Sequence, residues 1–515
     1  MFPRSATGRW LQSPAVLPLG LTLVLLAAAG LRLWQLGGKS LWFDEAYSLF
    51  IAQQPILEVL RLVRTHDTHP PLYYLMLHGW MALAGRSEVA VRFPSVAIGV
   101  ATALLTFQLA RRLAGDRVGI LAAALMAFSP FHIASSQEAR MYPLLTAFGL
   151  GASYALWLAL EEGRRRHWIA YVGLMLLALG SHHLAFLLLA AHGLYVILVH
   201  RNGVARRAWL GWTTVALIVY LPLLLPLLMD QLIAVGSGPN VRPPFGLRAV
   251  ADTLSMFSFG GNLFGTGSYF RRGVLPLAQH PAVVLPFLLL ACAGVAGVAG
   301  WRRRAYLLTC WLFPVVAAAA ISLKWNIFYE RYFVFALPPF LILVAAGIVH
   351  LAEGMGRVRW AVSPTLLALV ASFYLPALAD LYRATEFYDW RGAAAYVSRN
   401  ANPDDVLLFI PAFGRIPFDY YFRGAQARRS LNPQRMLVSS DQVHPTGEGS
   451  TEVLADLARR HPRMWIIATL PVGYENRLRI NRVLSPYFRE LEGRDFNAVY
   501  AFLWESRRWK PPDGR

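Results

Sequence analysis

Residues 15–31, AVLPLGLTLVLLAAAGL, form an uncharged apolar run, and the segment LWFDEAYS at residues 41–48 follows soon after it. A helix of about 20 apolar residues is long enough to cross a bilayer. Two arginines precede the run and no clear small-residue cleavage site follows it, so we interpret it as a retained first span with a cytoplasmic N-terminus. Asp44 and Glu45 then lie just beyond this span, where two carboxylates need solvent or a partner. We expect this acidic pair to be functional; a hydrated interfacial loop is the alternative.

The chain as a whole has the composition of a polytopic membrane protein. Of its 515 residues, 56% are hydrophobic and only 15% are charged, which excludes an ordinary soluble domain. A net charge of +20 would suggest a nucleic-acid partner in a soluble protein. Here, however, many arginines stand at the ends of apolar runs, where they set the orientation and contact phospholipids. We therefore expect membrane lipids, and no nucleic acid, among the partners.

Apolar runs of span length recur along the first 380 residues and predict about eleven transmembrane helices. The turns assigned to the inner side are mostly arginine clusters, whereas the outer loops contain acids, Arg or His, as the positive-inside rule requires. An odd number of spans places the C-terminus outside, so we expect a multi-pass protein of the cytoplasmic membrane. The predicted spans lie at 15–31, 89–109, 118–133, from 143 onward, 168–180, 184–199, up to about 229, 281–300, 305–322, 333–351 and 360–380.

Two of the predicted outer loops are long. The first, residues 35–88, contains amphipathic pieces near 57–63 and 72–83 that are too short and too polar to span, so we expect interfacial helices there. The second, residues 230–279, is rich in Gly and Pro. We expect this second loop to be mobile and to cover a site.

The end of the chain follows another pattern. We assign residues 1–380 to a transmembrane catalytic domain and residues 381–515 to a soluble domain on the periplasmic or extracellular side. In the second part apolar runs shorten to strand length and alternate with helical patterns, which predicts a small α/β domain of about 130 residues. The expected strands include 406–410, 465–468 and 498–503, and the expected helices lie near 390–399 and 451–459.

Charged and aromatic side chains suited to phosphate collect in the predicted outer loops. The planar fork of arginine binds two phosphate oxygens at once and stays charged when it is partly desolvated. The candidates for binding a donor phosphate or sugar are His69, Arg92, Glu138, Arg140, Tyr142, Arg331 and Tyr332.

Some of these residues have structural alternatives. Arg92 could be an interfacial anchor whose charged end reaches water, and Arg331 could simply pair with Glu330. His182 and His183 could line a pocket or bind a metal, but two adjacent histidines without a spaced third ligand are weak evidence for a metal site. We assign no metal site from the sequence.

The acidic pair suggests a division of labour. Neighbouring residues on a helix point about 100° apart, so Asp44 and Glu45 are expected to act separately rather than to share a proton. With a phosphate as leaving group, an enzyme must mainly deprotonate an acceptor hydroxyl and stabilise the departing charge. We assign the base to Asp44, with Glu45 beside it.

Several short motifs, taken in order, resemble a known family. They are the acidic pair after the first span, His69-Pro70-Pro71, the segment SQEARMY at residues 136–142, Glu330-Arg331-Tyr332 before a Pro-Pro-containing span, and YDWRG at residues 388–392. Together they resemble the GT-C glycosyltransferases, in the bacterial branch related to protein O-mannosyltransferases and the lipid A aminoarabinose transferase.

The resemblance implies the fold and the reaction. It implies a GT-C fold and an inverting hexosyl or pentosyl transfer from a polyprenyl-phosphate sugar to a hydroxyl or phosphate of a lipid, glycan or protein, on the outer side of the membrane. Asp44 matches the catalytic acid position of the family, and Glu45 completes the Asp-Glu pair of the O-mannosyltransferase branch. Where aminoarabinose transferases have Lys-Pro-Pro this chain has His69-Pro70-Pro71, and a neutral histidine would weaken the phosphate contact.

Other interpretations remain open at this point. No cofactor is required by this chemistry, although a divalent metal held by Glu and His side chains is an alternative. A transporter or flippase for a lipid-linked sugar would also be polytopic with intramembrane charges, and a glycan-binding scaffold would need no base. The residues name neither the sugar nor the acceptor.

Overall fold

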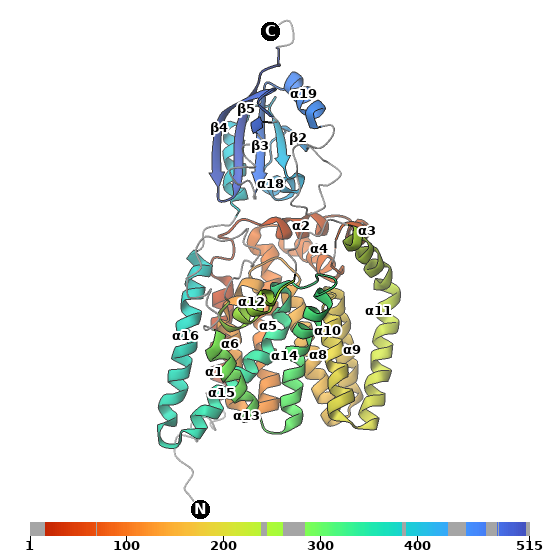
Figure 1. The fold of residues 1–515 in the computed structure, drawn as a ribbon, viewed down its shortest axis with the longest axis vertical. Coiled ribbons are helices and arrows are strands. Elements are labelled where there is room, and N and C mark those ends of the chain that lie inside the picture. Colours follow the sequence, from red (N-terminus) through yellow and green to blue (C-terminus); the bar gives the residue numbers. More distant parts are fainter. Residues whose placement is uncertain are drawn as a thin grey trace, which may run out of the picture. The chain divides into compact units, whose positions relative to one another are not determined.

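The computed structural model describes residues 16–67, 69–237, 245–260, 284–383, 388–430, 450–469, 481–482 and 484–510 (Figure 1). The chain forms two compact units. The larger one, here called the membrane unit, contains Met1–Leu36 and most residues from Val59 to Arg383. The smaller one, here called the C-terminal unit, joins Gly37–Glu58 to the residues from Ala384 onward. The predicted division had kept all of residues 35–88 with the spans, so the grouping of 37–58 with the C-terminal residues is new.

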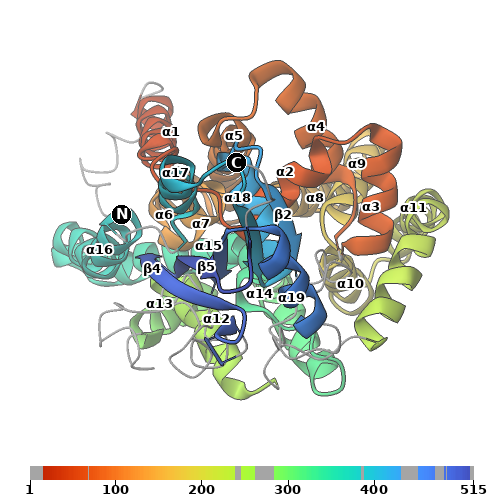
Figure 2. The same cartoon turned by 90° about the horizontal axis from the view of Figure 1, so that it is seen from above.

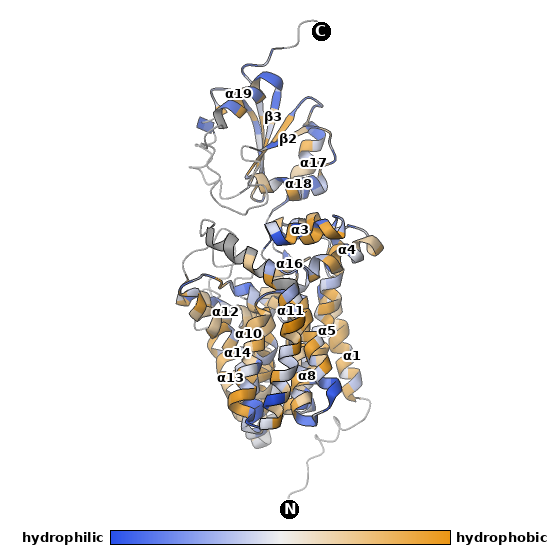
Figure 3. Cartoon of the chain, turned by 90° about the vertical axis from the view of Figure 1, so that its right-hand side faces the viewer, coloured by the Kyte–Doolittle hydropathy of each residue, from blue (hydrophilic) through white to orange (hydrophobic). Residues whose placement is uncertain are grey.

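Each of the predicted spans coincides with a helix or a pair of consecutive helices. Figure 3 shows apolar residues along these helices. They are α1 (Val16–Leu33), α5 (Glu88–Ala114), α6 (Asp116–Phe128) with α7 (Pro130–Ser136), α8 (Tyr142–Glu162), α9 (Arg165–Ser181), α10 (Ala185–Leu194) with η3 (Tyr195–His200), α11 (Gly203–Ser237), α13 (Leu285–Gly297), α14 (Trp301–Ser322), η6 (Glu330–Ala336) with α15 (Leu337–Gly354), and α16 (Arg359–Arg383).

A criterion based on helix length and composition alone gives a smaller number of membrane spans. Among the described residues, six helices are long and apolar enough to cross a membrane, or seven if the bent pair α6 and α7 is counted as one span. The total of about eleven spans and their orientation therefore stay predictions. Within the membrane unit, α8 and α15 are the most enclosed of these helices, whereas α1 and α16 lie at the edge (Figure 2).

The predicted span at 118–133 is broken in the structure. α6 ends at Phe128 and α7 begins at Pro130, with a bend of 59° between the two helices. Proline has no backbone N–H and cannot continue the hydrogen-bond ladder of a helix. The Ser129 side chain instead accepts a hydrogen bond from the backbone N–H of His132, at 3.5 Å, and so caps the start of α7. Hydropathy predicted the length of this segment but not its change of direction.

Two helices of the membrane unit touch through their backbones. A Cβ atom added to Gly294 in α13 would lie 1.9 Å from the carbonyl oxygen of Leu343 in α15. One added to Gly347 in α15 would lie 1.9 Å from the carbonyl oxygen of Leu290. Small residues permit such close approach, which is how helices pack where the hydrophobic effect offers little drive.

Three shorter helices complete the membrane side of the chain. α3 (Ile56–His66) and α4 (Leu72–Ala84) correspond to the predicted interfacial helices near 57–63 and 72–83. α12 (Leu247–Phe259) lies within the predicted mobile loop at 230–279, and its Phe257 ring packs 6.2 Å from that of Phe131 and 5.9 Å from that of Phe340. Residues 238–244 and 261–283 lie outside the described residues, so the predicted covering role stays a prediction.

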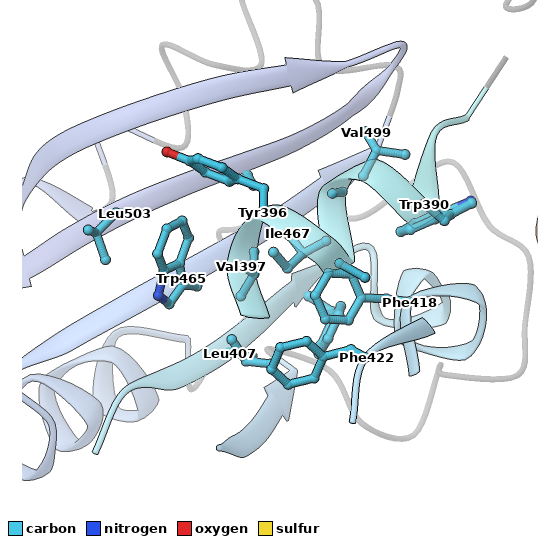
Figure 4. Packing of buried hydrophobic residues seen from close by; sticks show 14 residues of the cluster. Trp390, Tyr396, Val397, Leu407, Phe418, Phe422, Trp465, Ile467, Val499 and Leu503 are labelled. Carbon is cyan, nitrogen blue, oxygen red and sulfur yellow. The ribbon is translucent and has the colours of Figure 1, made fainter. Parts of the chain in front are cut away.

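The C-terminal unit is an α/β fold around a five-stranded sheet of order β2-β1-β3-β5-β4. β1 is parallel to β2 and β3, and β5 is antiparallel to β3 and β4. Side chains alternate across the sheet, so Leu407 and Phe409 join one core with α17 and α18, shown in Figure 4, while Leu408 joins a second core with α19. The elements are α17 (Trp390–Asn400), β1 (Val406–Ile410), α18 (Arg415–Tyr421), β2 (Ala427–Ser430), α19 (Ser450–Arg460), β3 (Arg463–Thr469), β4 (Phe488–Phe496) and β5 (Val499–Ser506).

A buried carboxylate joins the two central strands of this sheet. Asp405 accepts hydrogen bonds from Arg463 at 2.9 and 2.7 Å and from the indole N–H of Trp465 at 3.0 Å. The backbone N–H of Asn402 donates to the same carboxylate at 2.8 Å. These hydrogen bonds offset the cost of burying the charge.

Candidate functional site

Four rings from segments far apart in the sequence meet in the membrane unit. The His182 ring lies 4.9 Å from the ring of Tyr332 and 5.2 Å from that of His69, measured between centres. The Tyr142 ring lies 5.7 Å from Tyr332 and 6.1 Å from His182. His69, Tyr142 and His182 are buried. The structure thus brings together four residues that the sequence proposed separately.

Two guanidinium groups converge on one of these rings. The central carbon of Arg331 lies 5.0 Å from the centre of the Tyr142 ring, and that of Arg140 lies 5.8 Å from it. Arg140 is only 3% exposed. Arg331 forms an ion pair with Glu138; the pairing with Glu330 that the sequence offered as an alternative stays a prediction. Neighbouring like charges repel each other, and an anion would relieve that repulsion.

An acid that the sequence analysis missed lies beside these groups. Asp67 accepts hydrogen bonds from the ring Nδ1 and the backbone N–H of His69, both at 2.8 Å, and from the Tyr74 hydroxyl at 2.7 Å. Burial raises the pKa of Asp67, but His69, Arg140 and the Tyr74 hydrogen bond outweigh it, so the pKa lies below its usual range. The available signal was an acid two residues before His69-Pro70-Pro71 in an otherwise basic segment.

Asp67 fixes the state of its histidine neighbour. An ionised carboxylate only accepts hydrogen bonds, so the Nδ1 atom of His69 carries a proton and Nε2 is directed away from Asp67. Asp67 therefore orients the His69 ring, and the weaker phosphate contact expected of a neutral His69 stays a prediction.

We use the name polar cluster for eight residues of the membrane unit that these contacts connect. Its two arginines lie beside hydroxyl and imidazole groups, a combination that suits the oxygens of an anionic ligand. Its members are Asp67, His69, Glu138, Arg140, Tyr142, His182, Arg331 and Tyr332.

The two adjacent histidines differ in their surroundings. His182 belongs to the polar cluster, and its Nδ1 accepts a hydrogen bond from the backbone N–H of Leu184 at 3.1 Å, so a neutral His182 carries its proton on Nε2. His183 follows it at the turn between α9 and α10, where its carbonyl oxygen accepts from the N–H of Phe186 at 3.0 Å. Within the described part of the chain, no group of three or more His, Cys, Asp or Glu could hold a metal ion.

Arg92 is a buried side chain rather than an anchor that reaches water. It is 4% exposed, and its Nη1 donates to the carbonyl oxygen of Leu36 at 2.8 Å. The hydrogen bond ties α5 to the chain just before the acidic segment.

The acidic pair opens a helix of the C-terminal unit, α2 (Phe43–Ala52). The buried Glu45 carboxylate accepts a hydrogen bond from the backbone N–H of Trp42 at 3.4 Å, which is the position of a capping glutamate. Asp44 is partly exposed. The two acids therefore differ as expected for a division of labour, and Asp44 is the one accessible to a substrate.

Residues of the C-terminal domain hold the segment that carries α2. The backbone N–H of Leu41 donates to the hydroxyl of Tyr421 at 2.8 Å, and the Phe43 ring packs 4.7 Å from that of Phe413. Arg391, from the YDWRG motif, donates to the carbonyl oxygen of Gly37 at 3.1 Å. The motif thus serves to hold the acidic segment.

Part of the chain matches a protein-family model. Residues 68–225 match the model described as dolichyl-phosphate-mannose-protein mannosyltransferase. The match begins next to His69 and includes Arg140 and His182, residues of the polar cluster. No curated protein matches the chain in sequence.

Solved structures share the fold over nearly the whole chain. The structure resembles ArnT from Cupriavidus metallidurans bound to undecaprenyl phosphate, with a TM-score of 0.59, 13% identity, and coverage of 97% of this chain and 98% of ArnT. It also resembles the archaeal oligosaccharyltransferase AglB from Archaeoglobus fulgidus in complex with an inhibitory peptide and a dolichol-phosphate, with a TM-score of 0.57, 12% identity, and coverage of 95% and 74%. The mycobacterial arabinofuranosyltransferase AftD gives a TM-score of 0.55 at 12% identity, with coverage of 95% and 40%.

These findings confirm the resemblance drawn from the motifs and the predicted fold class. The family model supplies the relation to the mannosyltransferases, and the solved structures supply the fold. The chain has the polytopic helical fold of these membrane glycosyltransferases, and its residues 68–225 resemble the dolichyl-phosphate-mannose-protein mannosyltransferases.

Proposed function

We propose that the protein transfers a sugar, with inversion, from a polyprenyl-phosphate carrier to an acceptor on the outer side of the cytoplasmic membrane. The observation that carries this proposal is the convergence of Arg140 and Arg331 on the Tyr142 ring, beside His69. Such a group of cations and rings suits the phosphate of a lipid-linked sugar. The lipid phosphates named with ArnT and AglB support the same class of donor.

Asp44 is the proposed base. Its carboxylate takes the proton of the acceptor hydroxyl, and the acceptor oxygen forms a bond to the anomeric carbon of the donor. The bond between that carbon and the phosphate oxygen breaks in the same displacement, so the configuration inverts and polyprenyl phosphate leaves. Glu45 supports this step by capping the helix that carries Asp44.

The polar cluster is the proposed phosphate site. Charge grows on the bridging oxygen as the bond to the sugar breaks, and cations placed in advance stabilise that charge. Arg140 and Arg331 supply two guanidinium groups, and His69, oriented by Asp67, lies in the same cluster. This scheme requires no cofactor.

The acceptor is the open part of the proposal. The family model describes a protein acceptor, and AglB was solved with a peptide, whereas ArnT and AftD are named for other transfers. A lipid, a glycan and a protein are therefore all candidate acceptors. A transporter or flippase for a lipid-linked sugar is the alternative, and the family-model match, which is described for a mannosyltransferase, favours the transferase.

The test is sugar transfer by purified protein in lipid, with a panel of polyprenyl-phosphate sugars. We expect wild type to release polyprenyl phosphate from one donor and Asp44→Asn to be slower by about 10²–10⁴-fold, the usual contribution of a general base. The matched control is Asp456→Asn, which makes the same change at a partly exposed position of α19 and should behave as wild type.

Two outcomes would contradict this scheme. Full activity of folded Asp44→Asn would remove Asp44 as the base. Loss of activity on chelation, restored by one particular divalent ion, would replace the metal-free mechanism.

A further inference from the structure

The bend between α6 and α7 leaves backbone groups that need partners. The last carbonyl groups of a helix receive no hydrogen bond from within the helix. At a buried break, donors from elsewhere must therefore bond to them. In α6 these carbonyls include those of Met126 and Ala127, and the next helix starts at Pro130. Met126, Ala127 and Ser129 are buried, whereas the Phe128 side chain is exposed.

A single arginine from α1 fills this position. Arg32 is 0% exposed, and its Nη1 donates to the carbonyl oxygen of Ala127 and its Nη2 to that of Met126, at 3.0 and 3.2 Å. Its guanidinium also contacts Nδ1 of His132 at 2.6 Å and the Ser136 hydroxyl at 3.3 Å. A cation at the C-terminal end of a helix matches the helix dipole. The described partners of Arg32 thus span the end of α6 and the length of α7.

A side chain from the end of α7 makes the reverse connection. Gln137 Nε2 donates to the carbonyl oxygens of Trp34, Arg32 and Leu31 at 2.9, 3.1 and 3.4 Å. These are carbonyls at the C-terminal end of α1. Arg32 of α1 therefore caps the end of α6, and Gln137, which follows α7, caps the end of α1.

Helix α5 packs closely against this junction of α1, α6 and α7. A Cβ atom added to Gly99 in α5 would lie 2.4 Å from the Ser136 hydroxyl oxygen and 3.0 Å from Nε of Arg32. No side chain fits between α5 and these two groups. The junction is therefore enclosed and its geometry is defined by packing as well as by hydrogen bonds.

The residue after Gln137 begins the arginine-bearing part of the polar cluster. Glu138 pairs with Arg331, and the N–H of Arg140 donates to the carbonyl oxygen of Glu138 at 2.9 Å. We infer that Arg32 and Gln137 are positioning residues, which hold the segment carrying Glu138 and Arg140 in place for a lipid phosphate. This inference rests on the proposed phosphate-binding role of the polar cluster.

The test is a double-mutant cycle on affinity for undecaprenyl phosphate in lipid nanodiscs, which requires no knowledge of the sugar. We expect Arg140→Ala to weaken binding by about 10²-fold, as loss of a charged contact does. Arg32→Lys keeps the charge but loses the planar fork, and should weaken binding by about tenfold. In the Arg140→Ala background Arg32→Lys should cost clearly less than tenfold, because much of its effect on binding acts through Arg140.

A second double-mutant cycle uses Gln137→Ala in place of Arg32→Lys, so the test remains possible if Arg32→Lys fails to fold. Its matched control is Gln426→Ala, which also removes a donor to a backbone carbonyl but lies in the C-terminal unit. A purely structural role would lower thermal stability and leave the affinity of the folded protein unchanged.

The outcomes separate this inference from the proposed function. Wild-type affinity in folded Arg32→Lys and Gln137→Ala, or equal losses with and without Arg140, would overturn the positioning role alone. Wild-type affinity in Arg140→Ala would overturn the phosphate site and the positioning role together.

Discussion

The polar cluster of the membrane unit and the acidic helix α2 of the C-terminal unit differ in what holds them. The cluster draws residues from the segment before α4, from the segment between α7 and the start of α8, from the end of α9 and from η6; Arg140 is buried and Arg331 is partly buried. The acidic helix is held by other residues of the C-terminal unit, namely Tyr421, Phe413 and Arg391. Asp44 on this helix is partly exposed.

In the proposed reaction, two steps therefore depend on residues of different units. Binding of the donor phosphate depends on the membrane unit, whereas removal of the acceptor proton depends on a helix that belongs with the C-terminal unit. Changes in the C-terminal unit should therefore alter transfer and leave the affinity for lipid phosphate unchanged.

The largest effect is expected from breaking the sheet of the C-terminal unit. Asp405→Asn removes the charge that pairs with Arg463, whose pKa is raised by this hydrogen bond. Loss of one partner of a buried pair costs about 3 kcal/mol, at the low end of the usual range because Arg463 keeps some solvent contact. Denaturation monitored by Trp fluorescence and by limited proteolysis should show the loss in this unit.

Affinity for undecaprenyl phosphate is the control in that experiment. It should stay at the wild-type value while transfer falls. A parallel loss of lipid-phosphate binding would show that the two units are not functionally separate, and the comparison would fail.

A smaller effect is expected from releasing the acidic segment. Tyr421→Phe removes the acceptor for the buried N–H of Leu41, worth about 1 kcal/mol, or roughly a fivefold change in equilibrium. Transfer should fall by about that factor with lipid-phosphate affinity unchanged. Tyr487→Phe, in the same unit, is the control that should leave both unchanged, and a fall in affinity in Tyr421→Phe would contradict the assignment.

The smallest effect concerns α12 and depends on pH. Burial and the nearby Glu330 raise the pKa of Asp252 to about 6, with Arg248 opposing them. Because this pKa is above the usual 3.8 of an unfolded chain, the contribution of Asp252 to stability is full below that value and is lost as the pH rises through 6. Hydrogen exchange of α12 should therefore speed up modestly between pH 5 and 7.

Asp252→Asn serves as the matched variant. It should make exchange in α12 independent of pH in that range, beyond the intrinsic pH dependence of exchange itself. An unchanged pH dependence in this variant would assign the effect to another group. The polar cluster would then not depend on the charge of α12.

Local pattern predicted much of the fold. Apolar runs located the helices of the membrane unit, and three of the strands were expected where β1, β3 and β5 occur. β4 was missed because its outward residues are charged and it is mostly exposed, and β2 is only four residues long. α12 was missed because the Gly- and Pro-rich surroundings dominated the composition of its loop.

The site was predicted as a set of residues but not as an arrangement. Arginine chemistry and motif order were enough to nominate Arg140, Arg331 and His69. Asp67 was missed because its role depends on contacts with Tyr74 and Arg140 that only the fold creates. The attachment of α2 to the C-terminal unit was missed for the same reason, since its partners lie more than 300 residues away.

Arg32 also has a consequence for the order of biogenesis. Its carbonyl partners in α6 lie 94 and 95 residues later in the chain. At a synthesis rate of about 5–20 residues per second, α1 exists for roughly 5–20 s before they are made. An unpaired arginine costs about 3 kcal/mol at the centre of a bilayer and less near its surface. The first helix must therefore wait with Arg32 close to water, and it reaches its final depth only after α6 has been made.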